Sequence, residues 1–262
     1  MRLSFMTFAC PDYELHEVLA AAAKFGYAGV EPRVTAGHEH GIEPVAPAQA
    51  RASARKAFQD AGIEIACIAT SCRFASLERS EREKNRSQLM RHLELASDLG
   101  ARRIRVFGGK RAEGLDLDQA IQIVAEDLFS CADFAAQHGV KICLETHDDF
   151  SLGSSVGKVL QKADHPAVQA TWDVMHPYRA GESVADTVRH LSGKIAHVHF
   201  HDNEKGKALL PGDGDLPMAQ QIAALRSERF TGFLSAELWP EIGPPDFILQ
   251  EYHQRMVNLL AA

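Results

Sequence analysis

The sequence lacks the features that mark membrane, secreted and cysteine-rich proteins. No apolar run approaches the ~20 residues that a membrane-spanning helix needs. The N-terminal segment has no long apolar stretch before a small-residue cleavage site, and Asp12 and Glu14 follow early, so we expect no signal peptide. The five cysteines are an odd number without a C-x-x-C pair, which disfavours a disulfide framework and a cysteine zinc cluster. We therefore expect a cytoplasmic protein with no membrane partner.

An excess of positive charge is also absent. Lys and Arg number 28 against 35 for Asp and Glu, which gives a formal net charge of −7. Non-specific affinity for nucleic acid comes from Lys and Arg that displace counterions, so this composition disfavours a nucleic-acid partner, although a local basic pocket stays open. No linker rich in Pro, Gly or Ser divides the 262 residues. We predict a single domain over residues 1–262.

Short apolar runs alternate with longer helical patterns along the whole chain. The runs that predict strands are 3–9, 28–34, 63–70, 103–107, 141–146, 168–174, 195–200 and 232–238. The helical patterns are 15–25, 47–61, 79–99 and 116–138, each followed by a helix-terminating glycine, and the weaker 154–163, 183–191, 218–227 and 245–260. Eight strands alternating with eight helices predict an α/β fold, a single (β/α)8 TIM barrel, with a doubly wound open sheet as the alternative.

Ligand-type residues stand at the ends of the last four predicted strands. They are Glu145, Asp173, His199 and Glu237, spaced by about one strand–helix unit each. In a TIM barrel, residues at these positions meet at the C-terminal mouth, where such enzymes have their active sites. Three carboxylates and one imidazole suit one divalent ion such as Mn2+, Co2+ or Mg2+, with Zn2+ as a further candidate. The absence of a thiolate argues against a structural zinc site.

Each of these residues also fits an ordinary structural role. A glutamate at a strand end is more often solvated or ion-paired than a metal ligand, and Asp173 with His176 fits a helix cap. The alternation of His197, His199 and His201 fits one face of an edge strand. The occurrence of four such residues on four successive strands favours the metal site over these alternatives.

The same segments resemble a known family. The sequences around Glu145, Asp173, His199 and Glu237, together with Pro211-Gly-Asp-Gly-Asp and Gly26-Tyr-Ala-Gly-Val-Glu, resemble the xylose isomerase-like sugar isomerase/epimerase superfamily. This superfamily includes ketose 3-epimerases and hydroxypyruvate isomerase. The resemblance implies that the four residues are metal ligands and that the two glutamates form an acid/base pair. It also implies a homodimer or homotetramer.

The resemblance extends to substrate-binding residues, with one departure. It implies that His176, three residues after the aspartate ligand, contacts the carbonyl end of the substrate. The epimerase branch has an arginine six residues after the metal histidine, where this sequence has Lys205. Because lysine lacks the guanidinium fork, the departure weakens a ketohexose-epimerase assignment and leaves the metal site unaffected.

The chemistry of the four residues predicts a reaction type. A divalent ion chelated by the carbonyl and hydroxyl of a sugar stabilises a developing enediolate, and Glu145 and Glu237 on opposite sides of the carbon can remove and return a proton. We predict a small-molecule carbohydrate substrate, with His147, His176, Lys205 and Arg105 as substrate-binding residues. Arg105 fits a solvent-exposed salt bridge equally well.

Two other enzyme classes share such a barrel. A metal-dependent dehydratase or lyase uses the same enolate chemistry, and the sequence leaves this alternative open. An AP endonuclease, by resemblance, requires additional histidine ligands after the second and third strands and a D-x-H motif after the seventh. The third predicted strand is followed by Ser71-Cys72-Arg73, and residues 205–215 contain no D-x-H, so we disfavour this class.

Overall fold

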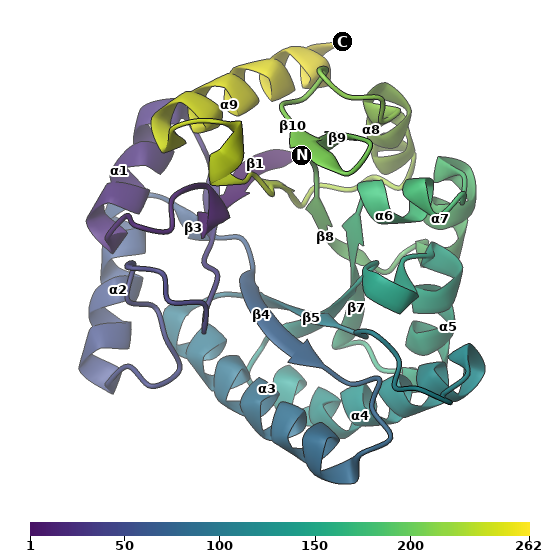
Figure 1. The fold of residues 1–262 in the computed structure, drawn as a ribbon. Helices are drawn as coiled ribbons and strands as arrows, with labels where there is room; N and C mark the ends of the chain where they lie inside the picture. Colours follow the sequence, from purple (N-terminus) through teal and green to yellow (C-terminus); the bar gives the residue numbers. More distant parts are fainter.

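Nine parallel strands form a ring that helices surround on the outside, and the computed structural model describes all residues 1–262 (Figure 1). The strands are β1 (Arg2–Met6), β2 (Gly29–Glu31), β3 (Glu64–Ile65), β4 (Ile68–Arg73), β5 (Arg103–Phe107), β6 (Lys141–Glu145), β7 (Val168–Asp173), β8 (Ile195–His199) and β11 (Phe233–Ala236). Their order in the sheet is β3-β2-β1-β11-β8-β7-β6-β5-β4. The arrangement confirms the predicted TIM barrel and rules out a doubly wound sheet.

The barrel closes through a divided strand. The sequence predicts one strand over 63–70, whereas β3 pairs with β2 and β4 pairs with β5. Only Ala66 and Cys67 separate the two pieces. The Ala69 N–H donates to the Pro32 carbonyl and the Val34 N–H donates to the Ala69 carbonyl, each at 3.0 Å. The single predicted strand is therefore two short strands, because the first piece pairs with β2 and the second pairs with β5.

The eight predicted helices are all present. They are α1 (Leu15–Phe25), α2 (Ala48–Ala61), α3 (Arg79–Leu99), α4 (Leu117–Gln137), α5 (Gly153–Ala163), α7 (Val184–Leu191), α8 (Met218–Ser227) and α9 (Pro245–Ala261). Helix α1 ends where Gly26 adopts a φ of +84°, a left-handed conformation that favours glycine, and α2 and α3 end in the same way. Helix α4 begins at Asp116, whose carboxylate accepts the Gln119 N–H at 2.8 Å.

Additional short elements follow the C-terminal ends of the strands. They are the helix α6 (Met175–Arg179), the hairpin strands β9 (Asp202–Glu204) and β10 (Lys207–Leu209), and 3-10 turns at Thr7–Ala9, Asp148–Phe150 and Pro240–Ile242. The first of these turns replaces the last third of the predicted strand 3–9. The segment 211–215 wraps around a buried carboxylate: Asp202 Oδ2 accepts the N–H groups of Gly212 and Gly214 at 2.9 Å each.

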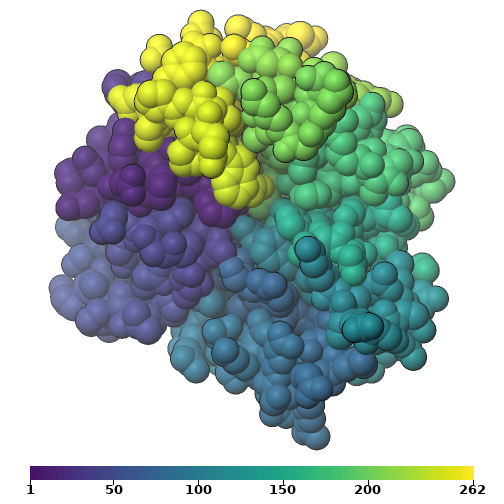
Figure 2. Space-filling view, in the orientation of Figure 1, coloured from purple at the N-terminus to yellow at the C-terminus, as the bar shows by residue number.

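The two faces of the barrel wall differ in polarity. In β6, Ile142 and Leu144 belong to a core of 66 buried apolar residues, while Glu145 lies in a polar cluster with His199. Figure 2 shows the ring from one end, with the yellow C-terminal segment reaching toward its centre. No helix has both the length and the apolar character needed to cross a membrane. Core packing thus occupies the outside of the barrel wall, and polar chemistry lies inside.

Candidate metal centre

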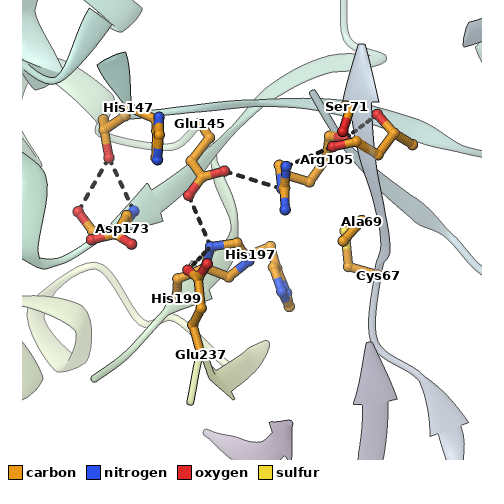
Figure 3. A network of polar contacts seen from close by, with 12 residues as sticks. Cys67, Ala69, Ser71, Arg105, Glu145, His147, Asp173, His197, His199 and Glu237 are labelled. Carbon is orange, nitrogen blue, oxygen red and sulfur yellow. Dashed lines mark hydrogen bonds and ion pairs between the residues drawn. The ribbon is translucent and has the colours of Figure 1, made fainter. Parts of the chain in front are cut away.

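The four predicted ligands come together at the C-terminal ends of their strands. Glu145 ends β6, Asp173 ends β7, His199 ends β8 and Glu237 follows β11 (Figure 3). Each offers one ligand atom, and these four atoms lie within 4.8 Å of one another. His199 Nδ1 lies 3.0 Å from Glu145 Oε1 and 3.3 Å from Glu237 Oε2. An ion with ligand bonds of about 2.0–2.2 Å holds opposite ligands at most ~4.4 Å apart, so small inward shifts would place all four around it.

The charges of this cluster suit a bound cation. Burial lowers the pKa of His199, but the carboxylates of Glu31 and Glu145 outweigh burial and hold it well above its ordinary value. Burial raises the pKa of Asp173, but His201 and His176 outweigh burial and hold it below the ordinary value. The side chains therefore favour ionised carboxylates beside positive charge. A divalent ion would supply the same positive charge, and the set of three carboxylates and one imidazole fits such an ion.

His199 is oriented by the carboxylate of Glu31, which comes from β2 on another side of the barrel. Glu31 Oε1 accepts a hydrogen bond from His199 Nε2 at 3.1 Å, and Glu31 Oε2 accepts one from His197 Nε2 at 2.7 Å. All three side chains are fully buried. Because Glu31 occupies Nε2, the other ring nitrogen of His199 faces Glu145 and Glu237. A carboxylate that orients a ligating histidine in this way fixes its tautomer and raises its basicity.

Two of the structural alternatives are resolved at Asp173 and His197. Asp173 Oδ1 accepts the N–H groups of Met175 at 2.8 Å and His176 at 3.4 Å, so this aspartate does cap α6. Its other oxygen accepts a hydrogen bond from His201 Nε2 at 3.0 Å. The histidine alternation lies on β8, which has β7 and β11 as neighbours, so the edge-strand interpretation is wrong. Asp173 thus combines a cap with a place in the cluster.

The four predicted substrate-binding residues lie in different surroundings. The rings of His147 and His176 are 4.3 Å apart, and His147 also lies 4.8 Å from the Phe107 ring. Arg105 is only 1% exposed, and its Nε lies 3.1 Å from Glu145 Oε2. Lys205 is exposed at the turn of the β9–β10 hairpin. The pair of histidines and Arg105 adjoin the cluster, and the role of all four toward a substrate stays a prediction.

Sequence reasoning missed the buried polar residues that support the cluster. Glu31 occurs in a quoted motif without a role, and its 166-residue separation from His197 gives no local signal. His201 continues the alternation of β8, which was the available signal for its contact with Asp173. Arg33, 9% exposed at the closure of the barrel, carried no signal. The roles of these residues become visible only in the folded barrel, where each contacts a residue from another strand or loop.

A curated protein aligns with most of this chain. It is the "Putative hydroxypyruvate isomerase" of Streptomyces coelicolor, 24% identical over 260 residues, an alignment that covers 89% of this chain and 88% of the relative.

Solved structures share the fold. The IolI protein with a bound zinc atom superimposes with a TM-score of 0.87 at 18% identity, covering 100% of this chain and 98% of that one. An L-ribulose 3-epimerase gives 0.85 at 17% identity, covering 99% and 94%. The family model described as "Xylose isomerase-like TIM barrel" matches residues 19–258. On this match the chain belongs to the xylose isomerase-like TIM barrel family.

Proposed function

We propose that the protein is a divalent-metal-dependent isomerase or epimerase that moves a proton on a small polyhydroxy carbonyl compound. The observation that carries the proposal is the placement of two carboxylates, Glu145 and Glu237, on one imidazole nitrogen of His199 from separate strands. Glu145 comes from β6 and Glu237 from the end of β11, with β7 and β8 between them in the ring. A ligand seated between the two glutamates can exchange a proton with either.

Glu145, Asp173, His199 and Glu237 would hold the ion. When bound, a divalent ion supplies Lewis-acid stabilisation of the negative charge that develops on the substrate oxygens as an enediolate forms. Mn2+, Co2+ and Mg2+ suit the three carboxylates, and the zinc of the IolI structure keeps Zn2+ among the candidates.

The two glutamates differ in their surroundings, which suits an acid/base pair. The Arg105 Nε lies 3.1 Å from Glu145 Oε2, so that carboxylate is oriented by an ion pair. Glu237 has a side chain that is 15% exposed, nearer to the mouth than the buried Glu145. One glutamate breaks a C–H bond by taking the proton. In an epimerase the other returns a proton to the same carbon from the opposite face, and in an isomerase one glutamate carries the proton to the neighbouring carbon.

His147 and His176 are proposed to bind the substrate oxygens. Their rings lie 4.3 Å apart, and His176 stands three residues beyond Asp173 with its N–H on the Asp173 carboxylate. Two imidazoles side by side offer donors to a carbonyl and a hydroxyl. Lys205 is proposed to reach the same substrate from the β9–β10 hairpin.

The relatives support the reaction class. The Streptomyces coelicolor relative is named as a hydroxypyruvate isomerase and one structural neighbour is an L-ribulose 3-epimerase. The proposed partner is a small molecule and not nucleic acid, in keeping with the net charge of −7. A dimer or tetramer stays a prediction that light scattering would test.

Proton exchange in D2O tests the proposal. The metal-loaded protein is incubated with ketoses, inososes, hydroxypyruvate and dehydroshikimate, and NMR follows loss of the carbon-bound proton signal. We expect metal-dependent exchange, with a new stereocentre for an epimerase and a moved carbonyl for an isomerase. Loss of water from the substrate would assign a dehydratase instead. Binding without exchange of any compound would contradict an enzymatic role.

A further inference from the structure

Two buried arginines near the metal centre differ in their partners. Arg105 is ion-paired with Glu145, as described above. Arg33 is 9% exposed and has no carboxylate within ion-pair distance. Its Nη1 donates to the carbonyls of Val34 at 2.6 Å and Ala69 at 3.2 Å, and its Nη2 donates to Ser71 Oγ. Its Nε is buried without any partner.

Arg33 lies beside residues that border the metal centre. It stands two residues beyond Glu31, and residues i and i+2 of an extended segment point to the same side. Its guanidinium lies 5.8 Å from the Phe8 ring, which stacks at 4.5 Å on Trp239, the residue two positions after Glu237. Arg33 is also close enough to Glu145 and Glu237 for both carboxylates to influence its pKa.

The structural role of Arg33 does not account for its charge. The donors on Nη1 join the two sides of the barrel closure, and a neutral donor could serve them. Burial, followed by the neighbouring Arg105, lowers the pKa of Arg33 to about 10, so the side chain is still cationic at neutral pH. A buried charge without a counterion is costly. The Nε–H has no partner, and together with an Nη–H on the same edge it forms the pair of donors that binds a carboxylate with two parallel hydrogen bonds.

We infer that Arg33 binds a carboxylate of the substrate, so that the substrate is a small hydroxy or keto acid and not a neutral sugar. The inference rests on the proposed function for its reaction and adds the class of substrate. A single guanidinium edge matches a planar carboxylate. A phosphate group shares the negative charge, and the test includes a phosphorylated compound to separate the two.

Three compounds with one carbon skeleton test the inference. Hydroxypyruvate carries a carboxylate, dihydroxyacetone carries a neutral hydroxymethyl group in its place, and dihydroxyacetone phosphate carries a phosphate. For the metal-loaded wild-type protein we expect D2O exchange with a kcat/KM highest for hydroxypyruvate. Two charge-assisted hydrogen bonds predict a preference of about 10- to 100-fold over dihydroxyacetone. Equal rates for the acid and the neutral compound, or a preference for the phosphate, would overturn the inference.

Substitutions assign the preference to Arg33. Arg33→Met removes the charge and should lower kcat/KM for hydroxypyruvate by about 10- to 100-fold through KM, with dihydroxyacetone little changed. Arg33→Lys keeps the charge and loses the fork, and should recover part of the loss. Arg51→Met is the matched control, because Arg51 also donates to a backbone carbonyl, that of Ala46, but is paired with Asp98 and contacts no residue of the candidate site. Equal losses for both compounds in both Arg33 variants would contradict the inference.

A binding measurement separates this inference from the proposed function. Calorimetry with D-glycerate and glycerol needs no turnover. We expect D-glycerate alone to bind, Arg33→Met to weaken its binding by at least 10-fold, and Arg33→Lys to weaken it by a smaller factor. If no compound exchanges a proton but D-glycerate binds through Arg33, the proposed reaction fails and the carboxylate site stands. If neutral ketoses exchange and D-glycerate does not bind, the carboxylate site fails and the reaction stands. If Arg33→Met does not fold, Arg33→Lys and the wild-type preference decide the question.

Discussion

The two halves of the barrel contribute different chemistry to one site. Strands β6, β7, β8 and β11 of the second half provide every predicted ligand, each at or just after its C-terminal end. The first half provides Glu31 beneath His199, Arg105 beside Glu145, and Arg33 near the mouth. Under the proposed function the second half would hold the ion, while the first half orients the ligands and, as inferred, binds the substrate anion.

The difference teaches where a sequence reveals function. In the second half, a residue that can bind a metal stands at the C-terminal end of each of four successive strands, so the spacing of these residues predicts a shared site. Residues of the first half act through contacts with single partners across the barrel, such as Glu31 with His199, 168 residues away. Substitutions in the two halves should therefore have different signatures: loss of metal and chemistry in one, loss of affinity and orientation in the other.

The largest expected effect is the loss of turnover in Glu145→Gln and Glu237→Gln. Each replacement keeps the size and one coordinating oxygen of the side chain and removes the base. We expect kcat for net epimerisation to fall by at least ~10²–10⁴ for each variant, measured by NMR, and D2O exchange is followed separately. In an epimerase each variant should still exchange the proton of one stereoisomer, whereas in an isomerase the loss falls mainly on one glutamate.

Glu94→Gln is the matched control for these two variants. Glu94 is exposed on α3, outside the site. Its replacement should leave turnover unchanged. Full activity in Glu145→Gln and in Glu237→Gln would remove both residues from the proposed mechanism.

Next in size is a graded loss of metal affinity. Asp173→Ala and His199→Ala should retain little bound metal after dialysis, because each removes a ligand. Glu31→Gln keeps all four ligands, removes the negative charge behind His199 Nε2 and leaves one acceptor oxygen for His197 and His199, so we expect a 10- to 100-fold weaker metal affinity. Titration with Mn2+ followed by electron spin resonance measures both. An unchanged dissociation constant in Glu31→Gln would mean that the first half does not tune the ligands.

Metal removal should lower thermal stability. An ion that binds only the folded chain stabilises it by about 2.7 kcal/mol at one hundred times its dissociation constant. For a chain of this size we expect chelation to lower Tm by roughly 5–10 °C. Calorimetry with and without chelator measures the shift, and Asp173→Ala should show none. A shift of equal size in Asp173→Ala would place the stabilising ion elsewhere.

The smallest expected effect concerns a histidine of the first half that lies outside the site. His92 on α3 is buried, and burial, followed by Arg33 and Arg91, lowers its pKa from 6.5 to about 4. The unfolded chain therefore takes up a proton before the folded chain does, and the free energy of unfolding falls as the pH drops below about 6.5. Between pH 6.5 and pH 5 this difference in proton uptake lowers the free energy of unfolding by up to ~2 kcal/mol.

Replacement of this histidine tests the sign of that effect. His92→Gln should flatten the decline in stability between pH 6.5 and pH 5, measured by urea unfolding at each pH. His16→Gln, at an exposed position on α1, should leave the decline as it is in the wild type. A decline that is equally steep in His92→Gln would show that another group causes it.

Much of the fold could be predicted because local sequence patterns indicate the strands and helices. Apolar runs and glycine stops placed all eight helices and seven of the eight barrel strands within a few residues. The division at Ala66 and Cys67 could not be predicted, because it depends on which neighbour each piece pairs with. The same holds for Arg33, whose missing counterion is a property of the folded barrel and not of any sequence pattern.

The most direct test of the account is the position of the ion in a crystal of the protein grown with Mn2+. The account predicts one strong anomalous difference peak at about 2.0–2.2 Å from ligand atoms of Glu145, Asp173, Glu237 and from His199 Nδ1. The buried trio of Glu31, His197 and His199 is the competing cluster. The main peak within that trio, on the Nε2 side of His199, or no peak at the mouth, would contradict the account.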